Sequence, residues 1–260
     1  MHERMSEWRR RWQELHPTWS HVLWTDPTGS HHVEGKCRGG TYVLTAPPPY
    51  RDLLGRACHL SQRSNIWRYL ITSRYGGLYV DTDVEPFKPV DDLVRGFSAF
   101  AARRRLLTNN PRIVECAFFG AVPNHPWLRQ VVEELPNRDP SVPLSMGVDY
   151  FTLVTEQHPE VATLPEDLVL FQLDDWCGAR SKAVVPDARD AQSFGTPTAF
   201  AKHHWSSTWF PESFRRIDAP TGPETASPGG GANFQIKHCP PCFREILGTL
   251  PRASTARSQS

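Results

Sequence analysis

The stretch SNIWRYLITSRYGGLYVDTDV, from Ser64 to Val84, decides the fold of this chain. Its first part carries apolar residues at three-to-four spacing, which predicts a helix that ends at Gly76-Gly77. The apolar run 78–80 follows and predicts a short buried strand. Asp81 and Asp83 come directly after that run, with Thr82 between them. A helix, a tight turn, a strand and a pair of carboxylates therefore form one continuous unit.

The two carboxylates are candidates for a metal site. Ligands of open α/β sheets bind beyond the carboxyl ends of the strands. Because strand residues alternate between faces, we expect Asp81 and Asp83 to point the same way. Neighbouring carboxylates repel each other unless a cation joins them, and Mg²⁺ or Mn²⁺ held by a diphosphate suits such a pair. Arg68 lies one turn after Asn65, so both can face the same site. A solvated acidic turn is the alternative interpretation.

Outward from this unit, helical and strand patterns alternate along the chain. Helices are expected at 4–15, 51–75, 126–135 and 148–157, and further strands at 21–24, 117–122 and 168–171. Residues 30–50 are expected to be rich in loops. This alternation predicts an α/β fold with a central sheet flanked by helices.

The composition fits one domain and a tail. The chain has 260 residues, of which 39% are apolar and 22% are charged, so it can bury a sizeable core. Residues 1–215 are expected to form the domain. Residues 216–260 are expected to form a Pro/Gly-rich linker and a flexible tail, which holds Cys239 and Cys242 as a CPPC motif. A redox or metal role for this lone CxxC pair stays open.

Charge and hydropathy exclude several partners. A net charge of +1 gives no global field that would collect nucleic acid. No apolar run approaches eighteen residues, so no membrane span is expected. The N-terminus has no apolar segment of the secretory type, and four of the six cysteines are scattered. We therefore expect reduced thiols and a cytoplasmic protein.

The run 64–86 resembles the DXD-containing sugar-binding region of glycosyltransferase family 32. That family includes fungal initiating mannosyltransferases and bacterial capsule and lipopolysaccharide glycosyltransferases, and the clostridial glucosylating toxins are distant relatives. Its pattern is roughly S-D-x-x-R-Y-x-x-L-Y-x-x-G-G-x-Y-x-D-x-D. The chain departs from the pattern at Asn65, Thr72 and Ser73, where the family has Asp, Leu and Tyr. It matches at Ser64, Arg68, Tyr69, Gly76, Gly77, Tyr79, Asp81 and Asp83.

A second segment, HHWSSTW at 203–209, resembles the C-terminal H-h-W-x-x-S-W element of the family. Thr208 stands where the family has Ser. The resemblance implies that His203, Thr208 and Trp209 approach the metal and the diphosphate. From residue type alone, a histidine close to Trp205 and Trp209 is more often a packed, hydrogen-bonded structural residue than a metal ligand. The chain has nine tryptophans; most, including Trp67, are expected in the core, whereas Trp205 and Trp209 are expected at the site.

The resemblance implies a GT-A fold with a mixed central sheet flanked by helices. It also implies transfer of a hexose from a nucleotide sugar with retention. It implies that Asp83 binds Mn²⁺ or Mg²⁺, with Asp81 and His203 beside it, and that Asp81 contacts the ribose or the donor sugar. Arg68 and Asn65 would hydrogen-bond the transferring sugar. Gly76, Gly77 and Tyr79 are expected to line the substrate site.

Three functions compete at this point. The first is a metal-dependent hexosyltransferase that uses a UDP- or GDP-hexose and a glycan, lipid-linked or protein acceptor. The second is a catalytically weakened nucleotide-sugar or glycan binder on the same fold, because Asn65 lacks the charge of the family Asp. The third is an interaction protein that uses the CPPC tail.

The family usually begins with an apolar strand of the type I-P-K-I-I-H-x-x-W, which helps to hold the nucleotide base. This sequence starts at a segment that resembles the following helix. We therefore expect a GT-A domain without its first strand, and a gap at its nucleotide-binding edge.

Overall fold

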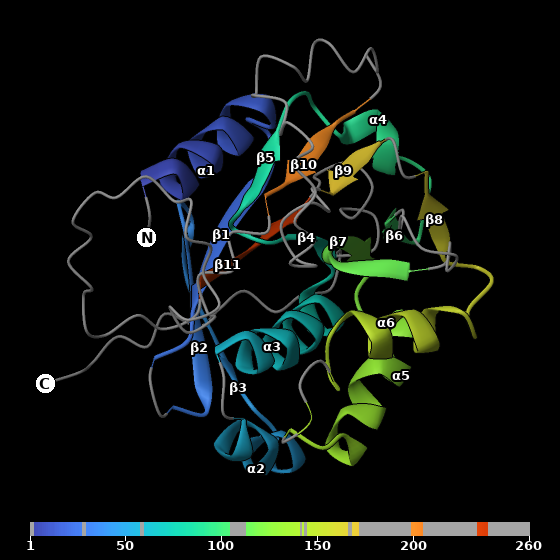
Figure 1. The fold of residues 1–260 in the computed structure, drawn as a ribbon. Helices are drawn as coiled ribbons and strands as arrows, with labels where there is room; N and C mark the ends of the chain where they lie inside the picture. The colour runs from blue at the N-terminus through green and yellow to red at the C-terminus, as the bar shows by residue number, and fades with distance from the viewer. Residues whose placement is uncertain are drawn as a thin grey trace, which may run out of the picture.

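The computed structural model describes residues 3–27, 30–57, 60–104, 113–140, 142, 145–165, 168–171, 199–204 and 233–238. Figure 1 shows helices packed around a central sheet, with a second, smaller sheet beside it. The helices are α1 (Glu3–Leu15), α2 (Pro48–Arg56), α3 (Leu60–Tyr75), α4 (Asp91–Val94), α5 (Pro126–Glu134) and α6 (Val148–Thr155), with a 3₁₀ turn, η1, at Leu135–Asn137.

The central sheet has eight strands in the order β3-β2-β1-β11-β4-β7-β6-β8. These strands are β1 (Ser20–Thr25), β2 (His32–Cys37), β3 (Gly40–Thr45), β4 (Gly77–Val80), β6 (Ala99–Arg104), β7 (Ile113–Ala121), β8 (Ala162–Leu164) and β11 (Asn233–His238). The sheet is mixed, because β6 and β8 run parallel whereas β11 runs antiparallel to both β1 and β4. The predicted α/β class with a mixed central sheet is confirmed.

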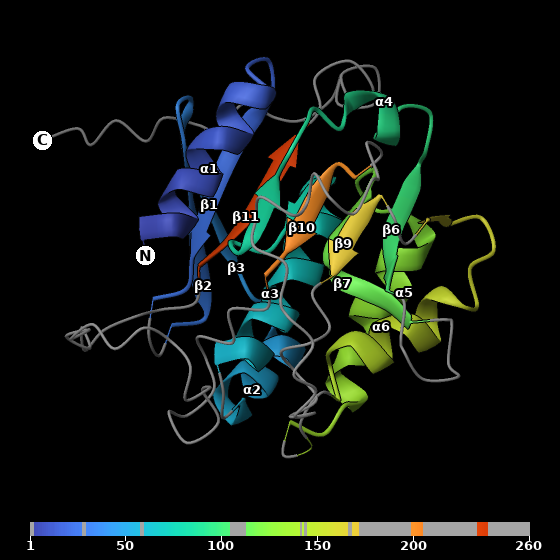
Figure 2. The same cartoon turned by 45° about the horizontal axis from the view of Figure 1, so that its top comes forward.

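The smaller sheet has the order β5-β10-β9. It consists of β5 (Val84–Pro86), β9 (Val169–Phe171) and β10 (Ala201–His203). β10 pairs antiparallel with β5 and parallel with β9. Figure 2 shows this sheet in front of the central one, with α1 alongside β5. The chain therefore passes from one sheet to the other between β4 and β5.

Two apolar clusters fill the two faces of the central sheet. Under α2, α3, α5 and α6, the aromatic rings of Tyr69, Phe119, Trp127 and Phe151 pack together, and Tyr69 stacks on Phe151 at 5.4 Å between centroids. The other cluster lies between the two sheets and includes Trp12 of α1. Side chains of β4 alternate between these faces. Leu78 and Val80 belong to the second cluster, and Tyr79 belongs to the first.

The expected core tryptophans are in place. Trp67 is fully buried, as predicted, and four others are also buried: Trp12, Trp19, Trp24 and Trp127. Trp12 donates its indole N–H to the Val84 carbonyl at 2.8 Å, which fixes α1 against β5.

Two expectations about secondary structure are wrong. The single helix expected over 51–75 is two helices, α2 and α3, because the backbone at Ala57 is extended (ψ 110°) and ends α2. Residues 30–50, expected to be rich in loops, contain the antiparallel pair β2 and β3. Period-two alternation is weak there because β3 lies at the sheet edge, with most of its side chains exposed on both faces.

The segment Asn233–His238 lies within the expected tail, yet it is a strand. β11 pairs with all six residues of β1 and with residues 78–80 of β4. The sheet is thus continuous from β3 to β8. The missing first strand and the boundary at 215 stay predictions, and Cys239 and Cys242 lie outside the described residues.

None of the helices in the described part of the chain is both long and apolar enough to cross a membrane.

One buried ion pair connects β1 to α3. Asp26 follows β1 directly, and its carboxylate accepts two hydrogen bonds from Arg63 of α3, from Nε at 2.6 Å and from Nη2 at 2.9 Å. Arg63 also donates to the carbonyls of Leu54 and Ser30. The two charged side chains are only 13% and 1% exposed, so neither charge can turn to water if the other is lost.

We therefore expect Asp26→Asn to lower the free energy of unfolding by about 3 kcal/mol, because it leaves the Arg63 charge buried without its counterion. Urea denaturation would measure the change. The matched control is Asp52→Asn, which removes an exposed pair with Arg56 (73% and 48% exposed) and should cost about 0.5 kcal/mol or less. Equal losses in the two variants would contradict a structural role for the buried pair.

Candidate active site

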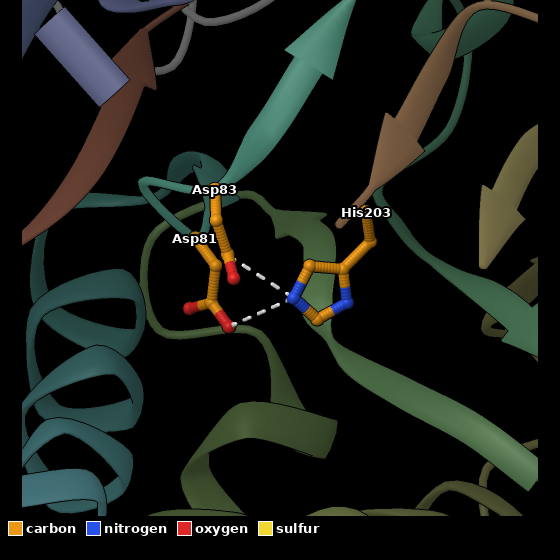
Figure 3. A group of neighbouring side chains, drawn as sticks. All are labelled: Asp81, Asp83 and His203. Carbon is orange, nitrogen blue, oxygen red and sulfur yellow. Dashed lines mark ion pairs between the residues drawn. The ribbon is translucent and has the colours of Figure 1, made fainter. Parts of the chain in front are cut away.

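The two aspartates lie where the chain leaves the central sheet. β4 continues its pairing with β7 for one more residue, since the Asp81 amide donates to the Ala117 carbonyl at 3.0 Å. The chain then turns, and the Val84 amide donates back to the Asp81 carbonyl at 3.1 Å. The two aspartates belong to this turn, and strand alternation does not orient them. Both carboxylates nevertheless point toward the same imidazole, as Figure 3 shows.

That imidazole belongs to His203, which the small sheet brings to the site. β10 pairs His203 with Val84 of β5, the residue after Asp83. His203 Nε2 lies 3.1 Å from Asp83 Oδ1 and 3.8 Å from Asp81 Oδ2. The ligand atoms of the three residues lie within 4.8 Å of one another, and His203 is buried. The structure thus brings Asp81, Asp83 and His203 together from segments 120 positions apart.

Arg68 approaches the same cluster from α3. Its Nη2 lies 3.2 Å from Asp81 Oδ1, and its Nη1 donates to the Cys116 carbonyl of β7 at 2.7 Å. Nη2 also donates to Ser64 Oγ at 3.2 Å. The guanidinium lies over the ring of Tyr79, 4.8 Å from its centroid. Arg68 therefore joins α3, β4 and β7 at the point where the sheet ends.

Asp81 is held on one side and open on the other. The Tyr79 hydroxyl donates to Asp81 Oδ1, the oxygen that also faces Arg68. The second oxygen, Oδ2, faces His203. The Tyr79 hydroxyl can reach Asp81 because β4 points the Tyr79 ring toward the face that α3 covers.

The electrostatics of the cluster favour a cation. Burial raises the pKa of the Asp81 carboxyl, and Asp83 adds to the rise while Arg68 opposes it. Burial alone would lower the pKa of the His203 imidazole, but Asp83, Asp81 and Glu115 raise it above its ordinary value. The rise at His203 reports a negative potential from the neighbouring carboxylates, whereas the rise at Asp81 comes mainly from burial. That negative potential attracts a divalent cation.

The residues present fit a divalent metal ion. The donor set consists of two carboxylates and one imidazole nitrogen. Mn²⁺ can bind all three groups, and Mg²⁺ can bind the carboxylate oxygens. Asp83 and His203 each offer one ligand atom, and Asp81 offers an oxygen beside its contact with Arg68. All three were among the predicted site residues, and metal binding itself stays a prediction.

Gly76 and Gly77 have a conformational role. Their φ angles are +65° and +102°, a region that favours glycine. The Gly76 amide donates to the Thr72 carbonyl and ends α3. A Cβ at Gly76 would lie 2.6 Å from Pro123 Cδ and 2.7 Å from Pro123 N, so no larger residue fits. This turn sets the direction of β4; substrate contacts of either glycine stay a prediction.

Asn65 and the C-terminal motif complete the predicted set. Asn65 is buried on α3, next to Ser64 and one turn before Arg68. Its contact with a sugar stays a prediction. Trp205, Thr208 and Trp209 lie outside the described residues.

The sequence analysis missed Glu115 and Cys116. Both are buried on β7, and the charge of Glu115 helps to raise the pKa of His203. Cys116 lies against Arg68, with Sγ 3.5 Å from Nη1, and burial raises the pKa of its thiol to about 11. An acidic residue in the otherwise apolar run IVECAFFGA was the available signal for Glu115. No such signal pointed to Cys116.

A family model described as the glycosyltransferase sugar-binding region containing a DXD motif matches residues 2–99. That span holds the whole of α3, the double-glycine turn, Asp81 and Asp83, but not His203.

Fungal proteins are similar over about half of the chain. Two mannosyl phosphorylinositol ceramide synthases of Saccharomyces cerevisiae are each 28% identical, over 137 and 127 residues. These matches cover 53% and 49% of this chain, and 32% and 30% of the relatives. Inositol phosphoceramide mannosyltransferase 3 of Schizosaccharomyces pombe is 28% identical over 123 residues, which is 47% of this chain and 30% of that protein. The chain thus spans about a third of the length of the curated relatives it matches. Residues 2–99, which carry the DXD pair in the turn after β4 and Arg68 beside it, are thus similar to the glycosyltransferase sugar-binding region that contains a DXD motif.

Proposed function

We propose that this chain is a metal-dependent glycosyltransferase. It transfers a hexose from a nucleotide-diphosphate sugar to a hydroxyl group of an acceptor, with retention at the anomeric carbon. The observation that carries the proposal is the convergence of Asp81, Asp83 and His203 at the end of β4, with Arg68 fixed behind Asp81. The match to the DXD-containing region supports the transferase class.

In this mechanism, Asp81, Asp83 and His203 would hold the metal. When bound, the ion supplies charge neutralisation for the nucleoside diphosphate that departs. Arg68 and the Tyr79 hydroxyl keep Asp81 in one orientation, so the open oxygen needs no rearrangement to meet a ligand. Such preorganisation is the main way in which a protein stabilises charge that develops during reaction.

The names of the relatives guide the choice of substrates. They are mannosyltransferases whose names include inositol phosphoceramide or mannosyl phosphorylinositol ceramide. We infer a mannose donor linked to GDP or UDP, and an acceptor hydroxyl on a glycan or on a lipid-linked polyol. The cytoplasmic location expected from the sequence and the absence of a nucleic-acid partner are part of the same proposal.

Loss of the Asp83 carboxylate tests the metal ligand. Asp83→Asn keeps the size of the side chain and removes its charge. Loss of a residue that only supports a ligand typically costs about 10–100-fold in metal affinity or activity. We expect a fall of about 100-fold or more in donor turnover with Mn²⁺, measured by release of the nucleoside diphosphate. Asp92→Asn, at an exposed position of α4, should leave turnover unchanged. Full turnover in Asp83→Asn would refute the role of this residue.

Metal removal tests the same site without turnover. A ligand that binds only the folded state at about 100 times its Kd adds about 2.7 kcal/mol of stability. For a chain of this size that corresponds to a rise in Tm of roughly 5 °C or more. We expect GDP or UDP to give this rise with Mn²⁺ and not with EDTA. A rise of equal size in EDTA would show that the nucleotide binds without the metal.

The second candidate, a catalytically weakened binder, rests on Asn65. This buried position lies on the same helix as Arg68, one turn away, where the family has Asp. A carboxylate there would stabilise the positive charge that develops on the sugar, whereas an amide carries no net charge.

Asn65→Asp separates the two candidates. If the missing carboxylate limits catalysis, the variant should raise kcat by about tenfold, which is 1.36 kcal/mol of barrier, and should leave the Kd of the nucleoside diphosphate within about twofold. Asn137→Asp, at an exposed position of η1, is the matched control. If the wild-type protein turns over its donor and Asn65→Asp leaves kcat unchanged, the weakened binder is excluded.

A further inference from the structure

A groove of about 490 Å³ lies between α1 and the β5 segment and is lined by residues of both. Its volume is within the range of about 300–1,000 Å³ that is usual for small-molecule sites. Figures 1 and 2 both show α1 running alongside β5. None of the residues discussed so far as metal or sugar ligands lines this groove.

Contacts of His204 connect the groove to the segments that carry Asp83 and His203. Glu85, which lines it, is two residues after Asp83, and its Oε2 lies 2.7 Å from His204 Nε2. The His204 amide donates to the Asp83 carbonyl at 3.1 Å. Trp8 also lines the groove, and its indole stacks on the His204 ring with centroids 4.5 Å apart and 14° between the planes. One end of the groove is therefore attached, through His204, to both metal-binding segments.

The charged side chains of the groove are close to balance. Glu7, Glu14 and Glu85 supply three carboxylates, and Arg10 and Arg11 supply two guanidinium groups. Arg10 forms an ion pair with Glu14 one turn further along α1. A lining with both signs has no strong preference for a phosphate-rich anion or for a polycation. The groove lining is also too polar for an alkyl ligand, because the ligand would displace water from the charged groups without replacing the lost hydrogen bonds.

A ligand with vicinal hydroxyl groups can form hydrogen bonds with both the carboxylates and the guanidinium groups of this lining. A hydroxyl donates one hydrogen bond and accepts others, so it can donate to a carboxylate and accept from a guanidinium at the same time. Hydrogen bonds to charged partners are the stronger kind. The indole of Trp8 and the ring of Phe87 add flat apolar surfaces, which suit the C–H faces of a ring that carries its hydroxyls at the edge.

We propose that the α1–β5 groove binds the acceptor as a neutral ring polyol, a sugar or an inositol ring, with its reacting end toward Glu85. The proposal rests on the proposed glycosyltransferase function for the identity of the ligand as acceptor. The groove itself binds the polyol without donor or metal, because none of its lining residues is a metal ligand.

The test is direct binding by saturation-transfer NMR, with methyl α-mannoside, methyl α-glucoside and myo-inositol as probes and without nucleotide. We expect saturation transfer to at least one probe in the wild-type protein. In the double variant Arg10→Ala/Arg11→Ala, the apparent Kd should rise by roughly tenfold or more. Both arginine side chains are more than half exposed, so the fold should survive, which an unchanged Tm would verify. Glu14→Gln should weaken binding in the same direction.

Arg129→Ala is the matched control, because Arg129 forms an equally exposed ion pair with Glu133 one turn along α5. Its Kd should equal that of the wild type. The arms with glucoside and inositol distinguish a sugar from an inositol acceptor. No saturation transfer from any probe, or equal Kd values in the double variant and the control, would overturn the groove assignment. If the polyol binds as expected but Mn²⁺ and nucleotide give no rise in Tm, the groove stands and the proposed transferase function fails.

Discussion

The contact between Arg68 and Asp81 fixes how α3, the end of β4 and the residues around Asp81 are arranged. Arg68 is buried, and its guanidinium reaches a carboxylate at the end of β4, a carbonyl of β7 and a hydroxyl of its own helix. A buried charge of this kind is tolerated only when its counterion and its hydrogen-bond partners are all in place. The position of α3 against the sheet and the orientation of Asp81 are therefore fixed together. The cluster of Asp81, Asp83 and His203 depends on that arrangement for its geometry.

The second constraint is the passage of the chain between two sheets. The turn at 81–83 ends β4 of the central sheet and begins β5 of the small one. Because β10 pairs with β5, His203 arrives beside Asp83 through backbone hydrogen bonds. Trp8 and Trp12 then hold α1 against this small sheet, one by stacking on His204 and one by donating to Val84. The small sheet thus positions His203 beside the two aspartates and forms one wall of the groove.

Local pattern was sufficient to predict much of this arrangement. The end of the helix before Gly76, the double-glycine turn, the strand expected at 78–80 and the paired aspartates are contiguous, so short-range rules describe them. His203 was found through a resemblance, because no local rule links positions 83 and 203. The pair β2 and β3 was missed since an exposed edge strand has weak alternation. Glu115 and Cys116 were missed because their role depends on which strand lies beside β4, and that pairing is a property of the tertiary fold.

The place of β11 has a consequence for biosynthesis. β1 and β4 are complete within the first 80 residues of the chain, but the strand that joins them lies at 233–238. During translation the facing edges of β1 and β4 therefore have no partner strand until β11 is made, about 150 residues after β4. Pairings this distant in sequence close slowly, since the entropy of the intervening loop is lost before the contacts form. The nascent chain is thus exposed to strand-mediated association at these two edges until residues 233–238 have been made.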